Sequence, residues 1–70
     1  MINSQLIGER IKEAREKKGL SQRALADKLG VAQPYICAME KGLRRPNLDM
    51  VAALSEVLGA SADYLLGKGE

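Results

Sequence analysis

Apolar side chains recur along this chain at intervals of three and four residues, the spacing that places them on one face of an α-helix. The pattern is clear in the first segment, where Ile7, Ile11 and Ala14 are separated mainly by charged residues. No segment shows the strict apolar–polar alternation of a half-buried strand. The pattern therefore predicts an all-α protein, with helices at about residues 6–18, 22–29, 33–40, 48–58 and 62–66.

Residues that start and stop helices frame these segments. Ser21, Asn47 and Ser61 each precede a predicted helix and can cap it, because their side-chain oxygens accept hydrogen bonds from free N–H groups of the first turn. A glycine follows each predicted helix within two residues, as is common where a helix ends. We expect one domain over residues 1–70, folded as a compact five-helix bundle. The expected core residues are Ile7, Ile11, Ala14, Leu25, Ala26, Leu29, Val31, Ile36, Met39, Leu48, Val51, Leu54 and Leu58.

Composition narrows the possible classes of protein. Hydrophobic residues make up 46% of the chain, too many for a disordered segment. No apolar run approaches the roughly 18 residues of a membrane helix, and no signal peptide is visible, so a cytoplasmic location is expected. The chain has one cysteine and no histidine, which argues against an internal disulfide, a zinc site or histidine-based catalysis. We expect no enzyme activity, cofactor, metal site or membrane partner, and no small-molecule site is evident.

Charge is distributed unevenly along the chain. Residues 1–45 hold ten Lys and Arg against five Asp and Glu, a balance of +5, whereas residues 46–70 hold one against four, a balance of −3. A basic half of this kind suits an anionic partner such as nucleic acid. Ordinary solvated surface charge would give the same totals, so charge alone does not decide between the two.

The segment SQRALADKLGVAQPYICAMEKG, residues 21–42, predicts two short helices joined by about three residues around Gly30. This is the helix-turn-helix layout. Gly30 suits the sharp turn because a left-handed backbone costs glycine almost nothing, and the small side chain of Ala26 lets two steeply crossing helices approach closely. A plain helical hairpin within a small bundle would show the same spacing.

Nearly the whole chain, from IGERIKEAREKKGLSQ to SADYLL, resembles the XRE-type helix-turn-helix domain, which is Cro-like and lambda-repressor-like. The resemblance is carried by R-I-K-x-x-R-x-x-x-G-L-S-Q, then L-A-x-x-L-G-V, then Glu-Lys-Gly and R-R-P. It implies a five-helix domain that binds double-stranded operator DNA, usually as a homodimer on a pseudo-palindrome. DNA recruits such a protein to the nucleoid.

The resemblance makes residues 33–40 the recognition helix. The expected base-reading residues are Gln33, Pro34, Cys37 and Ala38. The expected contacts to the DNA backbone are Gln22, Arg23, Tyr35, Lys41, Arg44, Arg45 and Asn47, although capping the next helix is the stronger role for Asn47. Arg15 is expected to pair with Glu40 beneath the binding surface. This pair is structural and reads no base.

Three positions near the recognition helix leave alternatives open. Ala32 stands where the family usually has a capping Ser or Thr, and Pro34 disfavours helical angles at Gln33. Gln33 is therefore a base reader, a solvated residue or the cap itself. Tyr35 contacts DNA or packs against the loop 42–45. Cys37 is an inert thiol or a redox sensor, and with Ala38 it makes the groove-facing surface apolar, so we expect DNA shape to carry part of the specificity.

The C-terminal part of the chain holds more apolar residues than one short helix can bury. The expected dimer interface consists of Val57, Leu58, Tyr64, Leu65 and Leu66. Alternatively, Leu65 and Leu66 close the core of the single chain. The favoured function is a transcriptional regulator, most simply a repressor, either minimal or part of a longer protein. The alternatives are an antitoxin or another protein-interaction module, and a restriction-modification controller.

Overall fold

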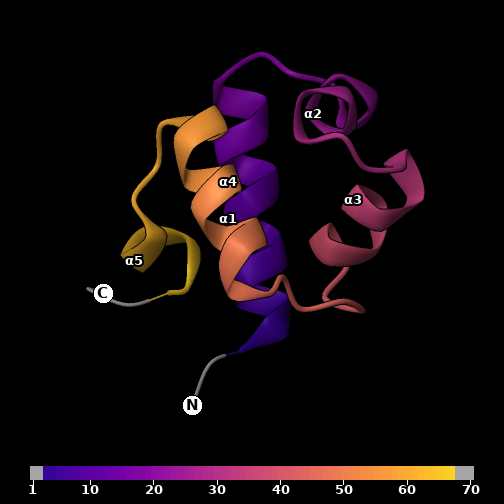
Figure 1. Cartoon of the computed structure of the whole chain (residues 1–70). Helices are drawn as coiled ribbons and strands as arrows, with labels where there is room; N and C mark the ends of the chain where they lie inside the picture. Colours follow the sequence, from indigo (N-terminus) through magenta and orange to yellow (C-terminus); the bar gives the residue numbers. More distant parts are fainter. Residues whose placement is uncertain (1–2, 68–70) are drawn as a thin grey trace.

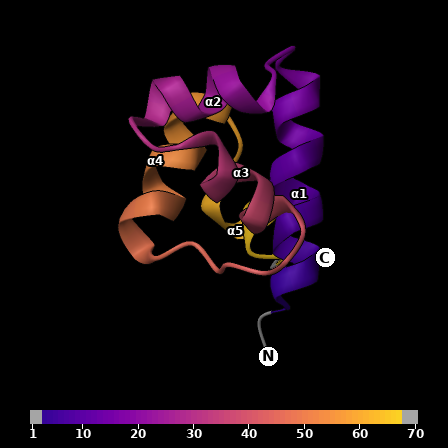
Figure 2. The ribbon, with the colours of Figure 1, turned by 90° about the vertical axis from the view of Figure 1, so that its right-hand side faces the viewer.

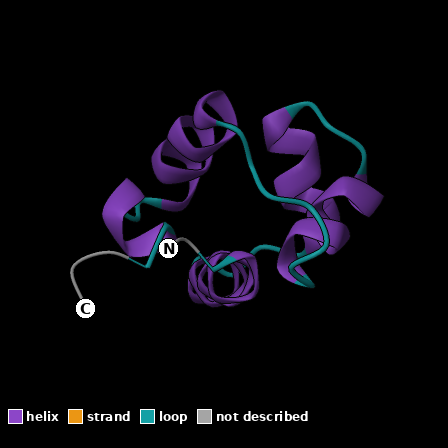
Figure 3. Cartoon of the chain, turned by 90° about the horizontal axis from the view of Figure 1, so that it is seen from below, coloured by secondary structure: helices purple, strands orange, loops and turns teal. Residues whose placement is uncertain are grey.

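The computed structural model describes residues 3–67, which form five α-helices and no strand. The helices span Ser4–Lys17 (α1), Gln22–Leu29 (α2), Gln33–Glu40 (α3), Leu48–Leu58 (α4) and Ala62–Leu65 (α5). Helix α1 runs between two groups, with α2 and α3 on one side and α4 and α5 on the other (Figure 1; seen along α1 in Figure 3). It contacts α3, α4 and α5, while α2 packs on α3 and α4. The prediction of an all-α five-helix fold is confirmed.

The bounds of α2, α3 and α4 coincide with those expected from the sequence, but the first and last helices differ. Helix α1 begins at Ser4 rather than residue 6, because Asn3 caps it: Asn3 Oδ1 accepts from the N–H groups of Gln5 at 2.9 Å and Leu6 at 3.2 Å. The predicted bounds therefore missed a capping asparagine before the first apolar residue. Helix α1 also ends one residue earlier than expected, and α5 ends at Leu65.

The expected caps form at the other helix starts. Ser21 Oγ accepts from the Ala24 N–H at 3.0 Å, Asn47 Oδ1 accepts from the Met50 N–H at 2.8 Å, and Ser61 Oγ accepts from the Tyr64 N–H at 3.1 Å. Gly30 ends α2 in the left-handed conformation, with φ of 71°, as the turn requires. Each cap supplies a partner for a backbone group that the helix leaves unpaired.

The core is aliphatic and joins all five helices. Its buried members are Ile7, Ile11, Ala14, Leu25, Ala26, Ile36, Met39, Leu54, Leu58 and Leu65, with Leu29 and Val31 half-buried against them. The expectation for Leu48 is wrong, since 83% of this residue is exposed. Leu48 is the first residue of α4, and Asn47 before it and Asp49 after it are also exposed. Burial in α4 begins with Met50 and Val51.

Helix α1 meets the end of α3 at a glycine. A Cβ atom at Gly8 would lie 2.4 Å from the Met39 carbonyl oxygen and 2.6 Å from that of Glu40. These are backbone atoms, so a side chain here would force the two helices apart. The contact brings the C-terminal end of α3, and with it Glu40, close to α1. The sequence shows Gly8 only as a glycine inside a helical pattern, and its role in packing was not predicted.

Candidate nucleic-acid interface

Helix α3 is most exposed at its start. Figure 2 shows α3 in front, with α2 crossing above it and the loop to α4 passing below. Gln33 and Pro34 are exposed, whereas Cys37 and Ala38 are half-buried. The loop after α3 folds back onto the helix, because the N–H groups of Leu43 and Arg44 donate to the Ala38 carbonyl at 2.9 and 3.3 Å. A partner approaching α3 therefore meets Gln33 and Pro34 first.

The geometry at the start of α3 settles the position of Gln33. Ala32 is the N-cap in extended conformation, its side chain makes no capping bond, and its carbonyl accepts from the Tyr35 N–H at 3.0 Å. Gln33 is thus the first helical residue and Pro34 the second, so the alternative in which Gln33 caps the helix is wrong. Pro34 fits there because a first-turn N–H has no partner within the helix in any case.

Arg15 and Glu40 form a two-bond ion pair between α1 and the end of α3. Arg15 Nε donates to Glu40 Oε2 at 2.6 Å and Nη2 donates to Oε1 at 3.1 Å, while Nη1 donates to the Leu20 carbonyl at 2.8 Å. The two side chains are only 10% and 4% exposed. The hydrogen bond to Glu40 raises the pKa of Arg15 above its ordinary value, against the opposing effect of burial. Arg15 therefore stays charged at every physiological pH.

Two glutamines extend this ion pair to the exposed surface. Gln22 Nε2 donates to Glu40 Oε1 at 3.0 Å, and Gln33 Nε2 donates to Gln22 Oε1 at 3.0 Å. An ionised carboxylate can only accept, so it requires the NH₂ group of Gln22 on its side. The oxygen of Gln22 then faces Gln33, which must present its own NH₂ group. The contacts from Gln22 to Glu40 and to Gln33 were not predicted, because residues 22, 33 and 40 come together only through the crossing of α2 and α3.

The basic candidates are exposed around this network. Arg23, Lys41, Arg44 and Arg45 all have exposed side chains. The Arg44 guanidinium lies 5.1 Å from the centre of the Tyr35 ring, so Tyr35 packs against the loop, the second of its two expected arrangements. Arg45 Nε donates to Ser4 Oγ at 3.0 Å, which ties the loop to the start of α1. Asn47 uses its side-chain oxygen to cap α4.

The expected dimer interface is only partly available. Leu58 is 5% exposed and Leu65 is 1% exposed, because both lie within the core of the single chain. Their assignment to a dimer contact is therefore corrected. Val57, Tyr64 and Leu66 are half-buried and retain some surface.

Neither a metal cluster nor a membrane-spanning helix is found in the part of the chain that the structure describes. Within residues 3–67, no group of three or more acidic, histidine or cysteine side chains is arranged to hold a metal ion. None of the helices described is both long and apolar enough to cross a membrane.

Comparison with known proteins identifies a family model and several relatives of similar sequence. A family model described as helix-turn-helix matches residues 11–65. The regulator ImmR of Bacillus subtilis is 41% identical over 64 residues, which cover 91% of this chain and 50% of ImmR. Repressor protein C2 of Salmonella phage P22 is 42% identical over 69 residues, covering 99% of this chain and 32% of the repressor. The chain spans about half the length of the first curated relatives it matches.

Two solved complexes with DNA share the fold. The P22 c2 repressor bound to a synthetic operator superposes with a TM-score of 0.85 at 42% identity, covering 94% of this chain and 98% of that one. The biofilm regulator SinR in complex with DNA gives a TM-score of 0.80 at 41% identity, covering 86% and 97%. The curated SinR of Bacillus subtilis is 40% identical over 62 residues, which cover 87% of this chain and 56% of SinR.

Proposed function

Because the chain belongs to the XRE-type helix-turn-helix family, we propose that it binds a specific double-stranded DNA operator and regulates transcription. Its simplest action is that of a repressor that blocks the polymerase by occupying the site. The chain of contacts from Arg15 through Glu40 and Gln22 to Gln33 carries the proposal, because it orients a polar side chain at the exposed start of α3. Binding to chromosomal DNA implies a cytoplasmic location.

Gln33 is the proposed base reader. One N–H of its amide is used by Gln22, which leaves the oxygen and a second N–H for a base. Adenine presents an N–H donor and an N7 acceptor in the major groove, and glutamine matches this pair. Pro34 offers an apolar surface suited to a thymine methyl group. Cys37 and Ala38 add little hydrogen bonding, so DNA shape supplies the rest of the specificity.

Contacts to phosphate hold the helix in its groove. Arg23, Lys41 and Arg44 are exposed cations on the elements around α3, and cations of this kind position a protein without reading sequence. The start of α2 adds free N–H groups and the positive end of a helix dipole. Gln22, the first residue of α2, keeps a second N–H for phosphate beside the one that it gives to Glu40.

Binding as a homodimer completes the proposal. Two copies related by a twofold axis would present two copies of α3 about 34 Å apart, one turn of DNA, to the half-sites of a pseudo-palindrome. Val57 and Leu66 are the proposed apolar contacts between copies, since Leu58 and Leu65 are buried within each chain.

Selection from random duplex DNA tests the function. The 70-residue chain is mixed with the pool at two salt concentrations and the retained DNA is sequenced. We expect a pseudo-palindrome with half-sites one turn apart, and Gln33→Ala should relax the preference at an adenine position by about tenfold. Weak, steeply salt-dependent retention without a motif would contradict specific binding and would favour a protein partner.

A further inference from the structure

A pocket of about 350 Å³ lies on the opposite side of α1 from the recognition helix, between α1 and the connection from α4 to α5. Its lining residues are Ala14, Lys17, Lys18, Leu58, Gly59, Ala60 and Tyr64. Pockets that bind small molecules have volumes of roughly 300–1,000 Å³ and pair an apolar lining with a few convergent polar groups. This pocket lies at the small end of that range and has both features.

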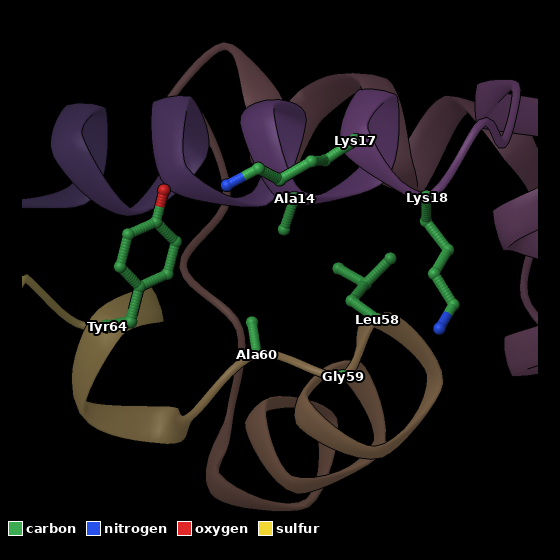
Figure 4. Close-up of a pocket in the computed structure, with 7 residues that line it drawn as sticks. All are labelled: Ala14, Lys17, Lys18, Leu58, Gly59, Ala60 and Tyr64. Atoms are coloured by element: carbon green, nitrogen blue, oxygen red, sulfur yellow. The ribbon is translucent and has the colours of Figure 1, made fainter.

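The apolar and polar groups of the pocket are separated. Ala14 and Leu58 belong to the buried core and Ala60 is half-buried, so the middle of the pocket is aliphatic on both the α1 side and the α4–α5 side. Figure 4 shows the Lys17 side chain running back along α1, so that its amino group lies near the Tyr64 hydroxyl at one end of the pocket. The Lys18 side chain bounds the other end, beside Gly59.

The two lysines are not accounted for by partners in the protein. Within residues 3–67, neither amino group forms a salt bridge, and the Tyr64 hydroxyl has no hydrogen-bond partner. Both lysines lie at the C-terminal end of α1, where a cation suits the helix dipole, and the Lys18 side chain lies beside Gly59 at the end of α4. Side chains in a helix lean toward its N-terminus, and this lean brings the Lys17 amino group from the end of α1 toward Tyr64 (Figure 4).

The wall that carries the hydroxyl is fixed in place. Arg10 Nη1 donates to the Tyr64 carbonyl at 3.2 Å, and the Arg10 guanidinium lies 4.5 Å from the centre of the Tyr64 ring. Arg10 is itself buried, with 8% exposed. The Tyr64 side chain is therefore held at one end of an apolar pocket before any ligand arrives, which reduces the entropic cost of binding.

We propose that this pocket binds a small-molecule carboxylate with a short apolar tail. The carboxylate accepts from the Tyr64 hydroxyl and pairs with Lys17, while the tail lies on Ala14, Leu58 and Ala60. The volume is too small for a folded partner, and the end that combines Lys17 with the Tyr64 hydroxyl offers one cation and one donor, which suits a single carboxylate. This proposal goes beyond DNA binding and does not depend on it.

Titration of the ¹⁵N-labelled chain with sodium hexanoate, followed by NMR at constant ionic strength, tests the proposal. We expect saturable shifts confined to residues that line the pocket, with a Kd on the order of 1 mM for so few ligand atoms. Hexanamide, which keeps the tail and loses the charge, should bind at least about tenfold more weakly, because it loses a charge-assisted hydrogen bond.

Three variants separate the parts of the site. Lys17→Gln should weaken hexanoate binding by about tenfold. Tyr64→Phe keeps the ring on Arg10, and its loss of the hydroxyl should weaken binding about fivefold. Lys28→Gln removes an exposed lysine of α2 and should leave hexanoate binding unchanged.

Other results would overturn the proposal. If hexanamide bound as tightly as hexanoate, the pocket would bind the apolar tail alone and would not recognise the carboxylate. Chemical-shift changes at all lysines would show non-specific binding of the anion. Equal effects of Lys17→Gln and Lys28→Gln would remove the assigned anion contact. Shifts of the pocket residues that follow protein concentration without ligand would show that a second copy occupies the pocket.

Discussion

Glu40 connects stability to recognition at the scale of single residues. Its carboxylate is 4% exposed and accepts from both Arg15 and Gln22. An acid at the last position of a helix opposes the helix dipole, so Arg15 offsets an unfavourable placement. Beyond the pair, Glu40 accepts from Gln22, which in turn accepts from Gln33, so a buried charge that adds little net stability also fixes the orientation of two amides.

Replacing Arg15 should therefore destabilise the folded chain. Arg15→Met leaves the Glu40 carboxylate buried without its cation and should lower the free energy of unfolding by about 3–5 kcal/mol. Urea denaturation at pH 7 measures the loss. The double variant Arg15→Met with Glu40→Leu should recover much of it, since both charges are then absent. A single variant as stable as the original chain would contradict the buried pair.

The pH dependence of the pair follows from the raised pKa of Arg15. A base whose pKa is higher in the folded chain contributes its full stability below the unfolded pKa, and loses it only as pH rises through the folded pKa. The Arg15 contribution should therefore be constant through the neutral range and disappear only in strong alkali. Urea denaturation of the original chain and of Arg15→Met between about pH 7 and 9 checks this: the difference in unfolding free energy should stay constant, and a difference that shrinks over this range would contradict the prediction.

Gln22 should act on base preference through Gln33. Gln22→Leu removes the acceptor that orients the Gln33 amide, so the adenine preference should fall about three- to tenfold, with a smaller loss of affinity for random DNA. Competition binding with operators that differ at one base pair measures the preference. Once Gln33 is alanine, adding Gln22→Leu should change the preference no further. Additive effects would mean that Gln22 reads a base independently.

At the scale of helices, the contact of α1 with the end of α3 determines where the network forms. Gly8→Ala would place a methyl group 2.4 Å from a backbone oxygen, so the stability should fall by at least about 3 kcal/mol, although alanine usually favours a helix by about 1 kcal/mol. Gly30→Ala is the control: its Cβ would meet open space, and only the left-handed backbone would cost about 1–2 kcal/mol. Thermal or urea unfolding compares them. A Gly8→Ala chain at least as stable as the original would contradict the close approach.

Helix positions were predictable because local signals agree. Apolar spacing, capping by Ser21, Asn47 and Ser61, and the turn at Gly30 all act within a few residues, and the structure contains each of them. Asn3 was missed although its signal is equally local. Leu48 was misplaced because periodicity assigns a face and does not show that the first residue of α4 lies outside the core.

Contacts between helices were predictable only through family resemblance. The pairing of Arg15 with Glu40 was expected on that ground, and no spacing rule connects residues 25 positions apart. The contacts from Gln22 to Glu40 and to Gln33, and the clearance at Gly8, depend on how α1, α2 and α3 cross. The pocket beside Lys17 depends likewise on the approach of α5 to α1.

At the scale of the whole molecule, the two sides of α1 carry different chemistry. Arg23, Lys41 and Arg44 belong to the side with α2 and α3, whereas Lys17 and Lys18 line the pocket on the side with α4 and α5. Total charge does not distinguish these two groups of cations, since all five lie in the basic half of the chain. We propose that only the first group contacts phosphate, and the salt dependence of binding tests this proposal.

Neutralising one cation at a time should change the salt dependence of DNA binding only for residues on the side of α1 that carries α2 and α3. For each phosphate contact that is lost, the slope of log affinity against log salt should become shallower by about 0.9. Arg23→Gln, Lys41→Gln and Arg44→Gln should each show this change and weaken binding about equally on operator and random DNA, because phosphate contacts carry no sequence information. Lys17→Gln and Lys18→Gln remove the same charge from the far side and should leave the slope unchanged, because at 0.15 M salt charges are screened over about 8 Å. Titrations between 50 and 200 mM salt measure the slopes, and an equal change in all five variants would mean that DNA responds to net charge and not to a defined face.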